Sequence, residues 1–120
     1  MLIKKFVDQQ EIIAGDNCIL RELLNGPIEN LPMKYSLAWA KVPIGATTWK
    51  HAMKTSEVYF IIKGVGRMHI NDEVEDVGSY DTIDIQPGAV QYIENIGSEE
   101  LEFLAIVDPA WKKEDEIVLE

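Results

Sequence analysis

The sequence predicts an all-β protein that folds as a single domain. Between Tyr35 and Val107 it consists of short apolar or alternating segments, each bounded by Gly, Pro, Asn or Asp, as is typical of β-sandwiches and barrels. The 120 residues suit one compact domain, and no internal repeat, charge block or Ser/Gly-rich linker divides them. Apolar residues make up 47% and charged residues 27% of the chain, so we expect a folded core rather than disorder.

Eight strands are expected in this region. We place them at residues 36–42, 49–53, 58–63, 66–70, 73–77, 82–86, 91–95 and 101–107. Asn71 and Asp72 tolerate positive φ, so the strands on either side of them should form a tight hairpin. His69 alternates with apolar neighbours on its strand, which favours an outward orientation.

The N-terminal strands, within residues 1–34, are less strongly specified. Residues 10–14 and 18–24 favour strands, although the second segment would also suit a helical turn. Residues 25–34 contain Gly-Pro and Leu-Pro pairs, and Gly and Pro interrupt regular structure, so this stretch is expected to be a loop.

The C-terminal segment, residues 108–120, follows the last expected strand. It fits a short helix or an extended tail that packs through Trp111 and Ile117. Its acidic residues are expected to form a solvated face.

The charge of the chain limits its partners. Twenty-one acidic and eleven basic residues give a formal charge of −10, and binding to nucleic acid or an anionic membrane needs the opposite sign. The N-terminus lacks a signal-peptide pattern and the chain has no run of eighteen apolar residues, so we expect a cytoplasmic protein. The single cysteine, Cys18, cannot form an internal disulfide and is expected to be a buried apolar residue.

Two segments have fixed spacings of polar residues and glycines. The first places, in order, Gly45, His51, Met53, Glu57 and Gly64. The second places, in order, Tyr80, Gln86, Gly88, Gln91 and Asn95. These spacings resemble the two motifs of the cupin superfamily, and the resemblance extends from about Cys18 to most of the remaining chain.

The resemblance implies a double-stranded β-helix, a jelly-roll barrel of two facing sheets. We therefore expect a single cupin domain over residues 1–120. Its conserved barrel would occupy about residues 35–107, between the N-terminal strands 1–34 and the C-terminal segment 108–120.

The resemblance also implies a metal site, from which this sequence departs. Cupins hold one divalent metal with two histidines and a glutamate of the first motif and a histidine of the second. Here His51 and Glu57 match, whereas Met53 and Gln91 stand in place of the other two histidines. His and Glu suit Zn, Fe, Mn or Ni, the Gln91 amide oxygen would add a weaker contact, and Met53 would suit Cu. A divalent metal and a metal-free barrel with a paired His51 and Glu57 both stay open.

Strand alternation identifies further residues of a pocket. It places Trp49 on the same face as His51, and Tyr59 and Ile61 on the same face as Glu57. We expect Trp49, Tyr59 and Ile61 to line a small-molecule pocket.

The expected function is that of a small-molecule-binding cupin. It would be a metal-dependent enzyme of isomerase or dioxygenase type acting on a polar small molecule, or a metal-free ligand-binding or sensory protein. In the absence of a metal, the apolar neighbours of Glu57 would raise its pKa and suit it to a general base. The sequence identifies neither the substrate nor a catalytic residue.

A homodimer is the expected assembly. Small cupins pair through a sheet face or an exchanged N-terminal strand, and the apolar N-terminal segments exceed what one barrel covers.

Overall fold

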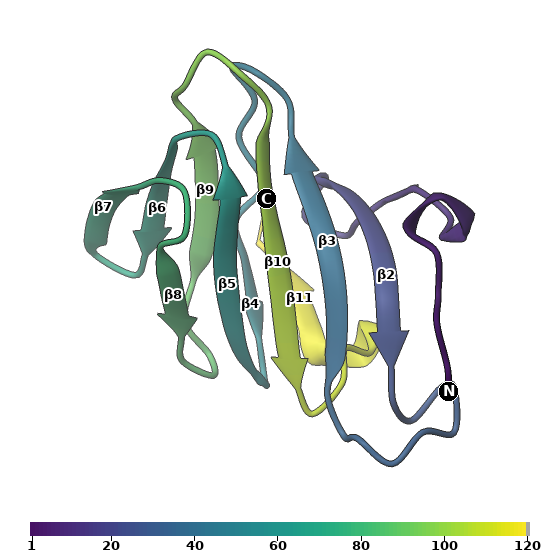
Figure 1. Ribbon diagram of the computed structural model, residues 1–120. Helices are drawn as coiled ribbons and strands as arrows, with labels where there is room; N and C mark the ends of the chain where they lie inside the picture. Colours follow the sequence, from purple (N-terminus) through teal and green to yellow (C-terminus); the bar gives the residue numbers. More distant parts are fainter. Residues whose placement is uncertain (120) are drawn as a thin grey trace.

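Two antiparallel sheets face each other in the computed structural model, which describes residues 1–119 (Figure 1). The expected all-β jelly-roll fold is confirmed. Within the described residues, no helix is long and apolar enough to span a membrane.

The first sheet has the strand order β1-β2-β3-β10-β5-β8, and every neighbouring pair is antiparallel. In this order the strands are Ile12–Ile13, Ile19–Asn25, Ser36–Val42, Leu101–Asp108, Ser56–Lys63 and Thr82–Ile85.

The second sheet has the order β11-β4-β9-β6-β7 and is also antiparallel. In this order the strands are Glu116–Val118, His51–Met53, Gln91–Asn95, Gly66–Ile70 and Glu73–Val77. Two short 3-10 turns, Phe6–Asp8 and Lys113–Asp115, lie near the chain ends.

Most strand predictions in the barrel are confirmed. The strands β3, β6, β7 and β9 begin and end where the sequence predicts, and β5, β8 and β10 differ by one or two residues. Asn71 has a φ of 53° between the paired residues Ile70 and Glu73, which confirms the hairpin. The strand predicted from residue 49 begins only at His51, because the Trp49 N–H donates instead to the Asp16 carbonyl.

The chain ends differ from expectation on the C-terminal side. The N-terminal strands are present as β1 and β2, and the loop expected at residues 25–34 begins one residue later, at Gly26, because Asn25 ends β2. The C-terminal segment was expected to be a short helix or an extended tail, but it contains a strand, β11, which pairs with β4. This pairing turns Ile117 outward, where it is 53% exposed, so the expected packing through Ile117 is wrong.

Buried apolar side chains fill one end of the space between the sheets. On β3 and β10 every second residue points inward, and the paired Val42 and Leu101 lie in this tightly packed end. Towards the other end of the same strands the inward positions are small, with Ala38 the partner of Ala105. Because alanines leave the space between the sheets unfilled, a cavity begins where the packed core ends.

Candidate functional site in the barrel cavity

A cavity of about 290 Å³ lies between the two sheets. Its wall is formed by residues of β1, β2, β3, β5 and β10 of the six-stranded sheet on one side, and by residues of β4 and β11 of the five-stranded sheet on the other. Ile12 and Ile13 line it and are also exposed, so they border its mouth. The volume is at the lower end of the range of small-ligand sites, roughly 300–1,000 Å³.

The lining of the cavity is apolar and acidic. Three aromatic residues take part, Tyr59, Phe103 and Trp111. The ionisable lining residues are Asp16, Cys18, Glu22, His51, Glu57, Tyr59 and Glu116, and none of the lining residues among positions 1–119 is Lys or Arg.

Glu57 is a buried carboxyl group in this wall. Its Oε1 accepts a hydrogen bond of 2.9 Å from Gln91 Nε2. Burial raises the pKa of Glu57 from 4.5 to about 7, against the opposing effects of the Gln91 hydrogen bond and the nearby His51. The group therefore gains and loses its proton near neutral pH.

Gln91 and Tyr59 hold Glu57 in place. Gln91 is fully buried on β9, and its Oε1 accepts a hydrogen bond of 3.1 Å from the Tyr59 hydroxyl on β5. Burial raises the pKa of Tyr59 well above 10, so this phenol stays neutral and donates. The relay from Tyr59 through Gln91 to Glu57 links the two sheets and fixes the amide orientation.

His51 points its second ring nitrogen into the cavity. The side chain is only 2% exposed, and Nδ1 lies 3.1 Å from the Trp49 carbonyl oxygen. Since a carbonyl only accepts, Nδ1 carries a proton there. Nε2 lies 3.8 Å from Asp16 Oδ2 and 3.8 Å from Glu116 Oε2, beyond hydrogen-bond length.

Asp16 and Glu116 complete this polar corner, and sequence analysis did not identify either. Asp16 lies in the turn after β1 and accepts a hydrogen bond from the Cys18 backbone N–H. Glu116 opens β11 and accepts one from Trp111 Nε1 at 3.4 Å; burial raises its pKa. The expectation that all C-terminal acids are solvated is wrong for Glu116, because β11 pairs with β4 and turns it inward. Only two β-branched residues, Ile117 and Val118, follow Glu116, which is too short a run to indicate a strand from the sequence.

The structure separates the residues that sequence analysis grouped. His51, Met53, Glu57 and Tyr59 line the cavity, whereas Gln91 lies behind its wall. Ile61 is fully buried in the packed core and does not line the cavity. Trp49 is 48% exposed and lies outside the cavity, since it precedes β4 and does not follow the alternation of that strand.

The four motif positions do not form a site suited to a hard divalent ion. The Gln91 oxygen that would be a ligand accepts from Tyr59, and its amide nitrogen donates to Glu57. Met53 offers only a soft thioether. In the part of the chain described, residues 1–119, no three His, Cys, Asp or Glu side chains are placed to hold a metal ion. Burial raises the pKa of the Cys18 thiol, so it stays protonated and apolar.

The two facing sheets and the internal cavity define a jelly-roll barrel with a buried site. Residues 38–107 match the family described as "Cupin domain", and the chain belongs to this family. Uncharacterized protein MJ1618 of Methanocaldococcus jannaschii is 41% identical over 109 residues, covering 90% of this chain and 86% of that protein.

Solved structures share the fold at lower identity. A predicted oxalate decarboxylase from Thermotoga maritima is 23% identical with a TM-score of 0.75, over 88% of this chain and 97% of that one. A Cupin 2 conserved barrel domain protein from Salinispora arenicola is 16% identical with a TM-score of 0.77, over 95% and 91% of the two chains. At these identities the likeness concerns the fold.

Proposed function

We propose that the protein is a small-molecule-binding cupin whose ligand occupies the cavity and contacts Glu57. The observation that carries this proposal is a buried carboxyl group that faces the cavity with a pKa of about 7. A buried charge is costly, so such a group is uncommon in an apolar wall unless a bound partner uses it.

The surroundings of Glu57 suit it to proton exchange with a bound molecule. Below its pKa the carboxyl group donates a hydrogen bond, and above it the carboxylate accepts one or takes a proton. Gln91 and Tyr59 keep the group oriented in both states, because Gln91 occupies only one of its oxygens. The apolar wall limits competition from water.

Of the two functions left open by the motif, we favour the metal-free binding function. The oxygen and the nitrogen of the Gln91 amide both form hydrogen bonds within the protein. His51 and Glu57 are then the only strong metal ligands among the four motif positions. Oxalate, named for the Thermotoga maritima relative, is also a poor match, because an anion would meet carboxyl groups and no Lys or Arg in the described lining.

Blocking the cavity tests the proposal. Ala38→Phe projects a ring into the cavity, whereas Ala52→Phe adds the same ring on the outer side of β4, away from the lining. Saturation-transfer NMR with a library of small amines, alcohols and acids should give ligands that bind the wild type and Ala52→Phe but not Ala38→Phe. Ligands that bind all three proteins equally would show that the cavity is not the binding site.

A further inference from the structure

We propose that the cavity binds a small organic cation, a primary ammonium group attached to a compact apolar body. This inference deepens the proposed function and rests on it. It follows from three features of the site: the charge of the lining, the acceptor atoms at His51, and the aromatic and apolar walls.

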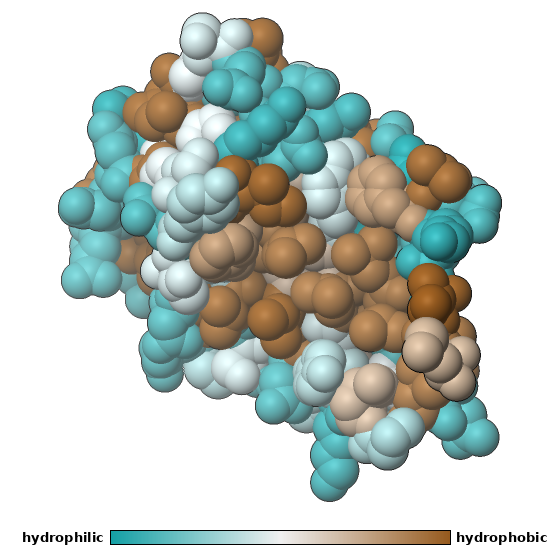
Figure 2. Space-filling model, in the orientation of Figure 1, coloured by the Kyte–Doolittle hydropathy of each residue, from teal (hydrophilic) through white to brown (hydrophobic). Residues whose placement is uncertain are grey.

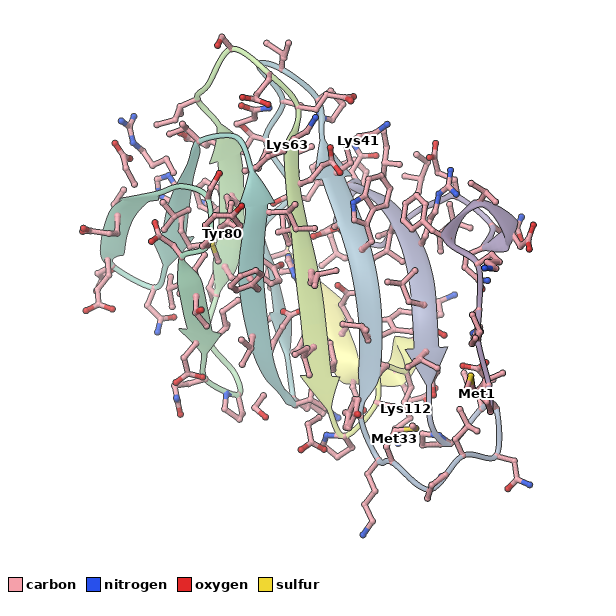
Figure 3. All side chains as sticks on the ribbon, in the orientation of Figure 1. Met1, Met33, Lys41, Lys63, Tyr80 and Lys112 are labelled. Carbon is pink, nitrogen blue, oxygen red and sulfur yellow. The ribbon has the colours of Figure 1, made fainter. Side chains whose placement is uncertain are left out.

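The charge of the lining is the first feature. Four carboxyl groups line the cavity, from Asp16, Glu22, Glu57 and Glu116, with no Lys or Arg side chain among the described lining residues. Lys41 and Lys63 lie together at one end of the six-stranded sheet (Figure 3), where they pair with Glu100 and Glu102. A cation in the cavity would reduce the repulsion among the carboxylates, and an anion would increase it.

The acceptor atoms at His51 are the second, independent feature. His51 Nε2 is buried, faces the cavity and has no hydrogen-bond partner among residues 1–119. Because Nδ1 donates to the Trp49 carbonyl oxygen, Nε2 is the ring nitrogen that remains for a ligand. Asp16 Oδ2 and Glu116 Oε2 each lie 3.8 Å from it, so two carboxylate acceptors lie on the same side of the cavity as this nitrogen. A primary ammonium carries three N–H donors and so has enough to donate to both carboxylates.

The two carboxylates are held towards this point by the protein. The Cys18 N–H donates to the other oxygen of Asp16, and Trp111 Nε1 donates to the other oxygen of Glu116. The second oxygen of each carboxylate lies beyond hydrogen-bond length from His51 Nε2, where a ligand could also reach it. Such prior orientation reduces the entropy lost on binding.

The walls and the volume of the cavity indicate what kind of group is attached to the ammonium. Tyr59, Phe103 and Trp111 provide aromatic surfaces that attract a cation electrostatically. Alanines at 38 and 105 leave a volume of about 290 Å³, which is far more than a bare metal ion fills. We therefore infer an organic body beside the ammonium group rather than an isolated divalent ion.

Three isosteric probes test the charge preference. Benzylammonium, benzyl alcohol and benzoate share one ring and differ in the charge of the polar group. In calorimetric titrations of chelator-treated wild-type protein, we expect benzylammonium to bind at least about tenfold more tightly than benzyl alcohol, as one charge-assisted hydrogen bond would give. Benzoate should bind more weakly than both.

Paired variants test the residues. Asp16→Asn combined with Glu116→Gln removes both charges and keeps the side-chain shapes. Benzylammonium affinity should fall about tenfold or more, while benzyl alcohol affinity stays within about twofold. Glu114→Gln, an exposed neighbour outside the lining, is the matched control and should bind like the wild type. Should the double variant not fold, Glu116→Gln alone gives the same comparison.

The outcomes separate this inference from the proposed function. Equal affinity for the three probes, or tightest binding of benzoate, would overturn the cation preference and leave the cavity as a small-molecule site. Unchanged benzylammonium binding in the double variant would overturn the role of Asp16 and Glu116. Failure of all three probes to bind, with zinc chloride binding instead, would overturn both.

Discussion

Glu57 combines burial, a cavity position and a pKa near 7 in one side chain. Its hydrogen-bond partner Gln91 on β9 is neutral, as is Tyr59, which in turn donates to Gln91, and neither is a cation that would keep Glu57 ionised. Ionisation of this buried carboxyl group near neutral pH therefore lowers the stability of the folded protein. Such a loss of stability is common where a residue is kept for function.

Glu57→Gln should remove this loss of folding stability, because glutamine does not ionise. The unfolded chain releases the Glu57 proton near pH 4.5 and the folded chain near pH 7, so wild-type stability falls as the pH rises between these values. The difference of the two pKa values corresponds to no more than about 3 kcal/mol above pH 7. We expect Glu57→Gln to exceed the wild type there by up to this amount and to match it near pH 4.5. Urea unfolding at several pH values measures this.

The control for this substitution is Glu75→Gln, an exposed residue on β7 that should change stability little at any pH. Lower stability of Glu57→Gln than of the wild type at every pH would show that the Glu57 carboxylate is a structural partner in the core.

Among the individual residues of the site, His51 and Glu57 could be predicted from the sequence, because their spacing follows a motif. It could not indicate Asp16 and Glu116, which come from opposite ends of the chain and reach His51 only through the turn after β1 and the pairing of β11 with β4. The prediction that Trp49 lines the pocket was wrong because side chains alternate between the two faces only within a strand, and Trp49 precedes β4.

Among the elements, the short strand β4 sets the site, because its residues meet both β11 and β9. His51 is the partner of Val118 on one side and of Gln91 on the other. The sequence predicted β9 and the core of β4 correctly, but it did not predict β11, since a three-residue strand is too short for a periodic signal.

Histidines at the two divergent motif positions test this register. Met53→His with Gln91→His replaces a thioether and an amide by imidazoles on β4 and β9. If these side chains converge with His51 and Glu57, the variant should bind Ni²⁺, Co²⁺ or Zn²⁺ at least about tenfold more tightly than the wild type. Titration calorimetry after chelator treatment makes the measurement.

The matched control for the histidine pair is Ala52→His with Tyr92→His, which places the new rings on the opposite face of the same two strands. An equal gain in both pairs would mean surface binding, and no gain in the first pair would mean that the motif positions do not converge.

Asn25, the last residue of β2, and the loop at residues 26–34 that follows it are closely packed, and Asn25 contacts the cavity-lining Trp111. The Asn25 side chain donates to the Trp111 carbonyl oxygen, and the Gly26 N–H donates to the Tyr35 carbonyl oxygen. A Cβ at Gly26 would lie 1.7 Å from the Met33 carbonyl oxygen, so no side chain fits.

Gly26→Ala should therefore lower the free energy of unfolding by about 2 kcal/mol or more. Gly78→Ala is the control, because its Cβ would meet nothing closer than 3.9 Å. Chemical unfolding of both variants makes the comparison, and equal stabilities would contradict the close packing of this loop.

At the scale of the whole molecule, the outer surface of the six-stranded sheet is apolar over its centre, as the brown area of Figure 2 shows. The strand registers define this outer face: Leu104 lies between Trp39 and Phe60, and Ile106 lies between Leu37 and Val58. A continuous apolar surface on a sheet favours self-association.

We expect a homodimer through this outer face, with a mass by light scattering of twice the chain mass of 13.6 kDa. Ile106→Lys places a charge at its centre and should give monomers, whereas Glu73→Lys, on the edge strand β7, should not. A wild-type mass near 13.6 kDa at micromolar concentration would contradict the dimer.

The location of a bound cation tests the proposed ammonium site in the cavity. A crystal structure of the wild-type protein with benzylammonium should show the ring beside Tyr59 and Trp111 in the cavity. Its nitrogen should lie within hydrogen-bonding distance of His51 Nε2 and of the Asp16 and Glu116 carboxylates. A structure with benzylammonium bound elsewhere on the surface and not in the cavity would contradict the proposed ammonium site.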